Sequence, residues 1–206
     1  VFTPEQLAQQ EIEYKETDVK LNQNNILNYL RDKGYKKEAV IGIMGNIEHE
    51  TDGSYDYQKK QINGKGVGLF QLDPGGDHVN QYNSYLDRNK REDSLEAQLD
   101  YFHETIYDKN SPALKSNGGT NASNLRRIFE EGTIEEVTEA ITSKWERPAD
   151  WWNANASKSP YKDDPKVQAK WKANLGDRIL RAKRIDNSLG KLFSDQGTPL
   201  TSDNNM

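Results

Sequence analysis

The chain has 206 residues and a net charge of −5 at pH 7; 30% of its residues are charged and 33% hydrophobic, and its mean hydropathy is −1.03. This length supports one domain with a core, to which four Trp, ten Tyr and five Phe contribute. The acidic balance argues against a nucleic-acid partner, which requires a basic face. The sequence has no cysteine, which excludes disulfides and thiolate metal sites, and no apolar run approaches the roughly 20 residues of a membrane-spanning helix.

Polar segments at both ends predict appendages around one folded domain at residues 23–190. Residues 1–22 predict a loosely attached N-terminal arm or linker, and residues 191–206 predict a flexible C-terminal tail. The first residue is Val1 and no signal peptide is visible, so we expect a processed product, or a piece of a larger protein, that something other than its own signal delivers.

Two helices are predicted first, and the second is expected to be central to the core. Residues 24–33 form a short amphipathic pattern that stops at Gly34. Residues 36–50 are nearly all apolar in their middle, which is typical of a buried helix. Residues 52–73 differ, because four glycines and an Asn-Gly turn signal interrupt any helix there. We predict a mainly α (α+β) fold with a small β-hairpin beside a helical bundle.

The remaining chain is predicted to be helical with two loops. The expected helices are 77–108 in one or two pieces, 124–131, 133–145 and 164–189, and the expected loops are 110–121 and 149–165. Thr133-Ile-Glu-Glu136 fits a capping box. The basic residues between Arg178 and Arg184 alternate with apolar ones, which predicts the solvated face of an amphipathic helix.

Glu50 is the strongest catalytic candidate. On a helical wheel with Ile43 at zero, Ile47 falls at about 40° and Glu50 at about 340°, inside the apolar arc, whereas Glu48 falls at about 140°. Partial burial and the negative end of the helix dipole both favour the protonated form that a general acid needs. The alternative is an ordinary helix-end glutamate, exposed or paired with a Lys or Arg.

The segment Gly66-Val-Gly-Leu-Phe-Gln71-Leu-Asp73 strengthens the catalytic interpretation. Glycines let a sugar ring approach the backbone closely, and the Gln71 amide can both donate to and accept from sugar groups. An acid at Glu50 facing a second carboxyl at Asp73 suits cleavage of a glycosidic bond. The candidate residues are Glu50 and Asp73 for catalysis and Gln71, Gly68, Phe70, Tyr55, Tyr57 and Trp151 for sugar binding.

Other signals carry less weight. Tyr55 and Tyr57 could stack on sugar rings or pack within the protein. One of Trp151 and Trp152 could line the edge of the sugar-binding cleft, and the alternative is a hydrophobic contact that holds the C-terminal helix in place. Glu146 with Arg147 is interpreted as a structural ion pair. The three histidines are too scattered for a convincing metal site, and we expect no metal and no cofactor.

Gly45-Asn-Ile-Glu-His-Glu50-Thr51 followed by Gly66-Val-Gly-Leu-Phe-Gln71 resembles the phage tail lysozyme family, whose pattern runs G-N-I-x-x-E-S and then G-x-G-L-x-Q. The segment from Gly68 to Asp73 is also similar to the G-L-M-Q-V-D strand of goose-type lysozymes, relatives of the soluble lytic transglycosylases. The resemblance covers about residues 24–148 and implies a lysozyme-like fold. It also implies cleavage of the β-1,4 bond between N-acetylmuramic acid and N-acetylglucosamine of peptidoglycan strands.

By position, the resemblance implies that Glu50 is the catalytic acid and that Asp73 orients the attacking water. The chain departs from the pattern at Thr51, which replaces a serine, and it lacks the second aspartate of goose-type enzymes, which leaves Asp52 and Asp56 as reserve candidates. We favour hydrolysis with inversion, and a lytic transglycosylase with Glu50 as acid and then base is the alternative.

The expected place of action is the bacterial cell wall during infection, with the protein carried in the phage tail or an injected particle among other virion proteins. An endolysin is an alternative within the same enzyme class. A non-catalytic structural or glycan-binding tail component is the alternative from another class.

Overall fold

The computed structural model describes residues 4–60, 66–72, 77–108 and 120–193, and this part of the chain is mainly α-helical. A π-helix, η1 (Ile141–Glu146), continues α7 directly, and a 3₁₀ helix, η2 (Gly190–Phe193), follows α9. The α-helices are α1 (Pro4–Asp32), α2 (Lys37–Glu50), α3 (Asp77–Asn89), α4 (Leu95–Tyr107), α6 (Thr120–Glu131), α7 (Ile134–Ala140), α8 (Ala149–Asn155) and α9 (Pro165–Leu189).

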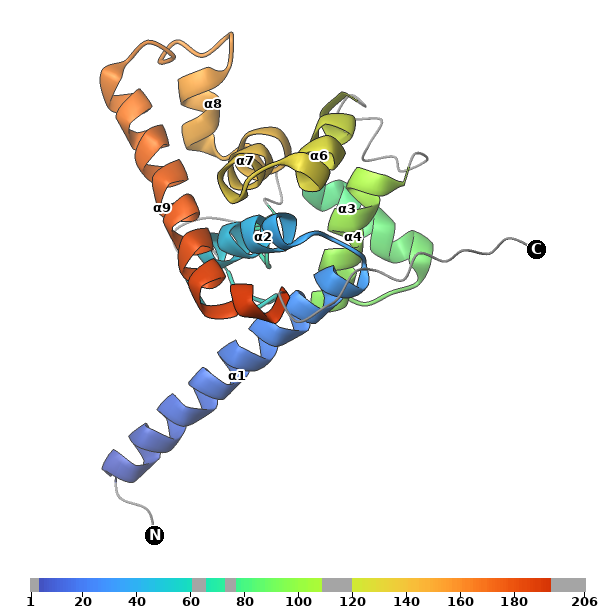
Figure 1. Ribbon diagram of the computed structural model, residues 1–206, viewed down its shortest axis with the longest axis vertical. Coiled ribbons are helices and arrows are strands. Elements are labelled where there is room, and N and C mark those ends of the chain that lie inside the picture. The colour runs from blue at the N-terminus through green and yellow to red at the C-terminus, as the bar shows by residue number, and fades with distance from the viewer. Residues whose placement is uncertain (1–3, 61–65, 73–76, 109–119, 194–206) are drawn as a thin grey trace, which may run out of the picture.

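Helix α2 is the central element, as predicted. Every residue from Ala39 to Ile47 is buried, because α9 and α7 both pack along α2 (Figure 1). Glycines permit this close packing: a Cβ atom at Gly42 would lie 2.5 Å from Val137 of α7, and one at Gly45 would lie 2.6 Å from Ala182 of α9. The apolar residues of α2 therefore pack against two helices, α7 and α9.

Residues 4–32 form one continuous helix, so the described part of the predicted N-terminal arm is helical, and its loose attachment stays a prediction. Figure 1 shows the first turns of α1 projecting away from the other helices, while its last turns join the core through Ile26, Leu27 and Leu30. The predicted helix at 24–33 is thus the packed end of a longer one. The sequence pattern predicted only this packed end, because residues 1–22 are polar and carry no clear helical period.

The predicted β-hairpin is wrong for the described residues, which contain only two isolated bridges, Lys60–Val67 and Val67–Leu72. Between the bridges the backbone turns, with positive φ values at Gly68 (+89°) and Gln71 (+46°). A left-handed conformation is incompatible with an extended strand. The glycine-rich segment is therefore a compact turn.

The later helices largely agree with prediction. The region 77–108 forms two helices, α3 and α4, and the Thr133–Glu136 capping box is present at the start of α7. The predicted loop 149–165 is wrong in its first half, where α8 forms after Pro148. Most of the predicted loop 110–121 and of the predicted tail 191–206 lie outside the described residues.

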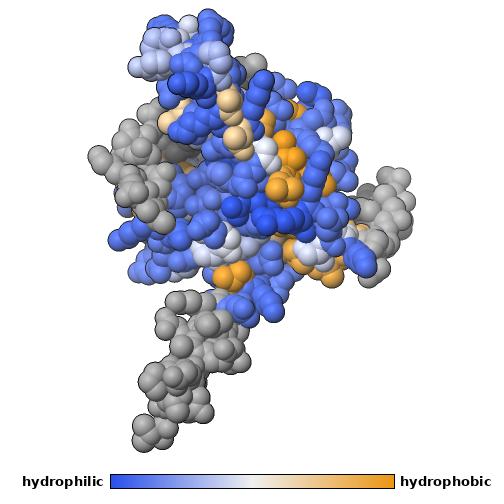
Figure 2. Space-filling view, turned by 90° about the vertical axis from the view of Figure 1, so that its left-hand side faces the viewer, coloured by the Kyte–Doolittle hydropathy of each residue, from blue (hydrophilic) through white to orange (hydrophobic). Residues whose placement is uncertain are grey.

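Figure 2 shows one face of the molecule, which is mostly hydrophilic with small apolar areas. The large hydrophobic side chains that are exposed, such as Leu180 and Trp152, come from different elements. Within the described part of the chain, no helix combines the length and the apolar character needed to cross a membrane.

Candidate active site

Glu50 is the last residue of α2, and its side chain is 15% exposed, which confirms the predicted partial burial. The predicted contrast with Glu48 is not seen, since that side chain is also 15% exposed. The helical-wheel prediction considered α2 in isolation, whereas in the structure α9 also covers the side of α2 that carries Glu48. Both carboxyl groups form ion pairs with α9.

Arg178 of α9 binds Glu50 directly, and this arginine was misread in the sequence as part of a solvated face. Its side chain is only 1% exposed. Its Nη2 donates to Glu50, and its Nη1 donates to Glu146 at 2.6 Å. One buried guanidinium therefore holds two carboxyl groups, and Glu146 pairs with Arg178 in place of the predicted Arg147.

Two asparagines complete the hydrogen bonding of the arginine. Nη1 of Arg178 also donates to Asn46 Oδ1 at 2.9 Å, and Nε donates to Asn174 Oδ1 at 2.9 Å. Asn46 is itself fully buried, and its amide nitrogen donates to the carbonyl oxygens of Gly42 and Thr138. This explains the Gly-Asn pair of the motif: Gly45 lets α9 approach, and Asn46 orients the guanidinium that reaches Glu50.

Glu146 reaches the site through the π-helix that follows α7. A π-helix carries one additional residue per hydrogen-bonded turn, and such turns are frequent at functional sites. The segment ends at Arg147, which has a φ of +48° and whose backbone N–H donates to the Thr142 carbonyl oxygen at 2.8 Å. The Glu146 side chain is 5% exposed, and its buried Oε1 atom has no hydrogen-bond partner among the residues that the structure describes.

Burial raises the pKa of Glu146 to about 8, and the nearby charge of Glu50 acts in the same direction, against the opposing effect of Arg178. The pKa of Arg178 is raised, since the attraction of the two carboxylates outweighs the opposing effect of burial. The site therefore combines a permanent cation with a buried carboxyl group whose pKa is raised.

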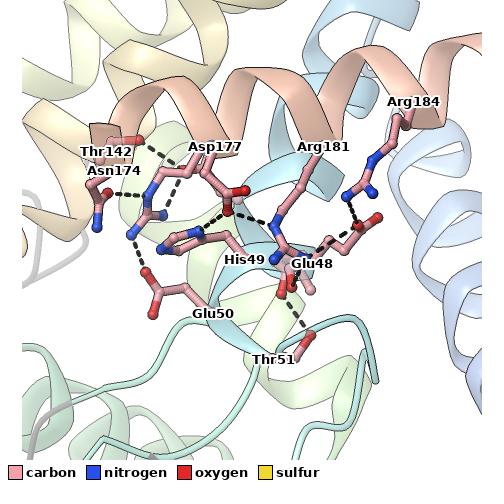
Figure 3. Close-up of polar contacts among 12 residues, drawn as sticks. Glu48, His49, Glu50, Thr51, Thr142, Asn174, Asp177, Arg181 and Arg184 are labelled. Carbon is pink, nitrogen blue, oxygen red and sulfur yellow. Dashed lines mark hydrogen bonds and ion pairs between the residues drawn. The ribbon is translucent and has the colours of Figure 1, made fainter. Parts of the chain in front are cut away.

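A second set of contacts ties the end of α2 to α9 (Figure 3). His49 Nδ1 lies 2.8 Å from Asp177 Oδ2, and the same oxygen accepts from Arg181 Nε at 2.7 Å. Glu48 Oε1 lies 3.1 Å from Arg184 and 3.4 Å from Arg181. Burial, and secondarily the charge of Arg178, lowers the pKa of His49. The contact between His49 and Asp177 holds the residue next to Glu50 against α9.

Thr51, where the family pattern has serine, retains the function of a hydroxyl. It is fully buried, its Oγ1 donates to the Ile47 carbonyl oxygen at 2.7 Å, and it accepts from the Tyr55 backbone N–H at 3.0 Å. The hydroxyl thereby stabilises both the C-terminal end of α2 and the turn that follows it.

The glycine-rich turn is held by Gln98 of α4, which the sequence analysis missed. Its Oε1 accepts from the Leu69 backbone N–H at 2.8 Å, and its Nε2 donates to the Tyr57 carbonyl oxygen at 2.9 Å. A Cβ atom at Gly68 would lie 2.4 Å from that Oε1, so glycine is required here for packing as well as for its φ of +89°. Gln71 Nε2 donates to the carbonyl oxygens of Lys59 and Gly68, which holds the turn from within.

Two predicted sugar-binding residues lie in the hydrophobic core instead. Phe70 is 4% exposed and stacks on Phe102 with ring centroids 4.9 Å apart. Tyr55 is 2% exposed, and its hydroxyl donates to Glu48 at 2.7 Å. Neither ring face is open to a sugar in this structure. Tyr57 and Trp151 are partly exposed, so their predicted contact with sugar stays a prediction.

Asp73 lies outside the described residues, so its position relative to Glu50 stays a prediction. The reserve candidates Asp52 and Asp56 line a surface hollow of about 510 Å³ between the turn after α2 and residues 18–22 of α1. Among the residues that the structure describes, no group of three or more His, Asp or Glu side chains is arranged to hold a metal ion.

The geometry offers a partly exposed carboxyl group at a helix end, joined through one arginine to a buried carboxyl group whose pKa is raised. This arrangement is suited to proton transfer at Glu50. Glu146 and Arg178 are its unpredicted members. The sequence signal that could have found Arg178 is its spacing of one helical turn from Ala182, which packs on Gly45 of the motif.

No solved structure gives a significant match to the chain. A family model described as phage tail lysozyme matches residues 21–170, which is most of the chain and includes α2, the glycine-rich turn and Glu146. The chain therefore belongs to the phage tail lysozyme family.

Proposed function

We propose that this protein cleaves the β-1,4 bond between N-acetylmuramic acid and N-acetylglucosamine in peptidoglycan, with Glu50 as the general acid. Its family indicates a lysozyme-like, peptidoglycan-degrading domain associated with phage tails. The assignment of Glu50 is supported by its place in the motif that resembles the family pattern, within the residues that the family model matches, combined with a mostly buried carboxyl group at the end of α2. Glycoside cleavage requires such a group to protonate the leaving oxygen.

The fate of the sugar depends on a second group. In our preferred route a carboxylate activates water and the bond is hydrolysed with inversion, which requires a separation of about 6.5–9.5 Å from the acid. Asp73 is the first candidate for this role, with Asp52 and Asp56 in reserve. In the alternative route Glu50 acts first as acid and then as base, and the product carries an anhydro end, as in lytic transglycosylases.

Clearing of purified cell walls tests the assignment of Glu50, with Glu50→Gln as the variant and Glu48→Gln as its control. The two glutamates lie on the same helix end, are equally exposed and both pair with α9. Since general acid catalysis contributes about 10²–10⁴-fold, Glu50→Gln should lose at least about 100-fold in rate and Glu48→Gln should stay active. Wild-type clearing by Glu50→Gln would refute the assignment.

Mass spectrometry of the released muropeptides distinguishes the two chemical routes. Hydrolysis leaves reducing ends, whereas transglycosylation leaves anhydro ends that are lighter by one water. Asp73→Asn adds a second criterion, because it should abolish hydrolysis but leave most of a transglycosylase activity.

A non-catalytic, glycan-binding tail component is the second candidate, and the ion pair between Glu50 and Arg178 favours it. An arginine stabilises the ionised form of a carboxyl group and thus opposes proton donation. Binding of the wild-type protein to purified walls without any clearing would support this second candidate.

A further inference from the structure

We propose that Glu146 is a positioning residue for Glu50: by pairing with Arg178 it supplies the counter-charge that allows Glu50 to take up a proton. This inference rests on the proposed function. It addresses the feature that opposes that function, which is the ion pair between the catalytic carboxyl group and an arginine.

The first step is the charge balance around Arg178. A guanidinium that is 1% exposed needs at least one ionised partner, because a buried and unpaired charge is strongly destabilising. Arg178 has two carboxyl groups within hydrogen-bonding distance, Glu50 and Glu146. One carboxylate is enough to neutralise the arginine, so the other carboxyl group can be protonated without leaving the arginine unpaired.

The second step is the proton itself. Glu146 is more buried than Glu50, and within the described part of the chain its Oε1 has no hydrogen-bond partner, which makes an ionised Glu146 costly. Burial accordingly raises its pKa to about 8. The charged groups that act on Glu146 are Arg178 of α9 and Glu50 of α2. His49 beside them has a lowered pKa, so at neutral pH it adds no positive charge.

Near neutral pH the cluster therefore holds one cation, one anion and one proton. In one arrangement Glu146 is protonated and ionised Glu50 pairs with Arg178. In the other, Glu50 is protonated and ionised Glu146 pairs with Arg178. Exchange between them requires Glu146 to release a proton to solvent and Glu50 to take one up, and Arg178 stays paired throughout.

Bound substrate favours the second arrangement. A sugar that covers Glu50 removes it from water, which disfavours its charged form, while Glu146 is already buried and changes little. Glu50 then gives its proton to the glycosidic oxygen as the C–O bond breaks, and its carboxylate returns to Arg178. Glu146 recovers a proton from solvent, which restores the first arrangement.

Glu146→Gln tests the inference through the pH dependence of wall clearing. The neutral amide cannot balance Arg178, so Glu50 is held as the carboxylate partner of the arginine. We expect the alkaline limb of the activity profile, where the acid loses its proton, to move at least about one pH unit lower. At pH values above the shifted limb, the variant should be about tenfold less active than the wild type. Glu146→Asp keeps a carboxylate and should restore the limb toward the wild type, whereas Glu48→Gln should leave it in place.

An active Glu146→Gln protein with an unchanged alkaline limb would overturn this inference and leave the proposed function standing. A wild type that clears no walls would overturn the proposed function and, with it, the catalytic role of Glu146. These two failures are distinguishable in the same assay.

A readout that needs neither activity nor the folding of Glu146→Gln is the titration of Glu146, followed by carboxyl ¹³C NMR. The charge of Glu50 raises the pKa of Glu146. Glu50→Gln removes that charge, so that Glu146 becomes the only carboxyl group of this pair that binds Arg178. The midpoint for Glu146 should therefore be lower in Glu50→Gln than in the wild type. An equal or higher midpoint would contradict the sharing of Arg178.

Discussion

Replacing Gly45 by alanine would test whether the close approach of α2 and α9 creates the site. The added Cβ atom would lie 2.6 Å from Ala182 Cβ, 2.9 Å from Ala182 Cα and 3.0 Å from Ala182 N. Carbon atoms prefer a separation of about 3.5–4.0 Å, so the two helices must separate by about 1 Å. Two of the three contacts are to backbone atoms, which cannot rotate away.

The expected cost follows from two opposing effects. Overpacking of a core by a methyl group destabilises by about 1–3 kcal/mol, whereas replacing glycine by alanine within a helix stabilises by about 1 kcal/mol. We expect a net loss of about 0–2 kcal/mol in the free energy of unfolding. Wall clearing should fall as well, because Arg178 lies one turn from Ala182 and moves with α9 away from Glu50.

Urea denaturation of four variants provides the measurement. Gly176→Ala is the matched control: it lies within α9, a Cβ atom there meets nothing within 4 Å, and the change should stabilise by about 0.4–1 kcal/mol. Gly45→Ala combined with Ala182→Gly should cost less than the sum of the two single changes, with a coupling of about 0.5–3 kcal/mol. A Gly45→Ala protein as stable as Gly176→Ala, or strict additivity in the double variant, would refute the packing argument.

Two further variants test the local elements that frame the site. Thr51→Val removes the hydroxyl that binds the Ile47 carbonyl oxygen and the Tyr55 N–H. Because it leaves a buried N–H unpaired, it should lower the free energy of unfolding by about 1–3 kcal/mol. Thr51→Ser should stay close to the wild type, and equal stability of both variants would contradict this role of the hydroxyl. Thr133→Ala removes the hydroxyl oxygen that accepts from the Glu136 backbone N–H at the start of α7, and it should lower the thermal unfolding midpoint by an amount that corresponds to about 0.5–2 kcal/mol. An unchanged midpoint would show that this cap contributes nothing.

Local patterns predicted the helices that bury an apolar stripe. Helix α2, the pair α3 and α4, and α9 all have apolar residues at helical spacing, and the Thr133–Glu136 signature placed the start of α7. The failures are equally local in origin. Residues 1–22 are polar in sequence, so no helix was predicted there, and the turn near Gly68 is set by Gln98 of α4 and by positive φ angles.

The candidate site was predictable only in part, because its members are far apart in the chain. Glu50 was found from its place at the end of an apolar helix and from the motif around it. Arg178 follows 128 residues later in a basic amphipathic pattern that predicts a solvated face, yet it is among the most buried side chains of the described residues. Pattern reading places a residue on a helix face but does not say which other helix covers that face.

The sequence by itself determined what depends on near neighbours: the helical periods, the cap of α7, the partial burial of Glu50 and the family motif. The tertiary structure alone decided which charges meet. Pairing of Glu50 and Glu146 with Arg178 depends on a spatial distance that no residue spacing encodes, and the raised pKa of Glu146 depends on burial by three packed segments. Burial and ion pairing act through space and scale with the loss of water, so they become defined only when α2, η1 and α9 have packed together.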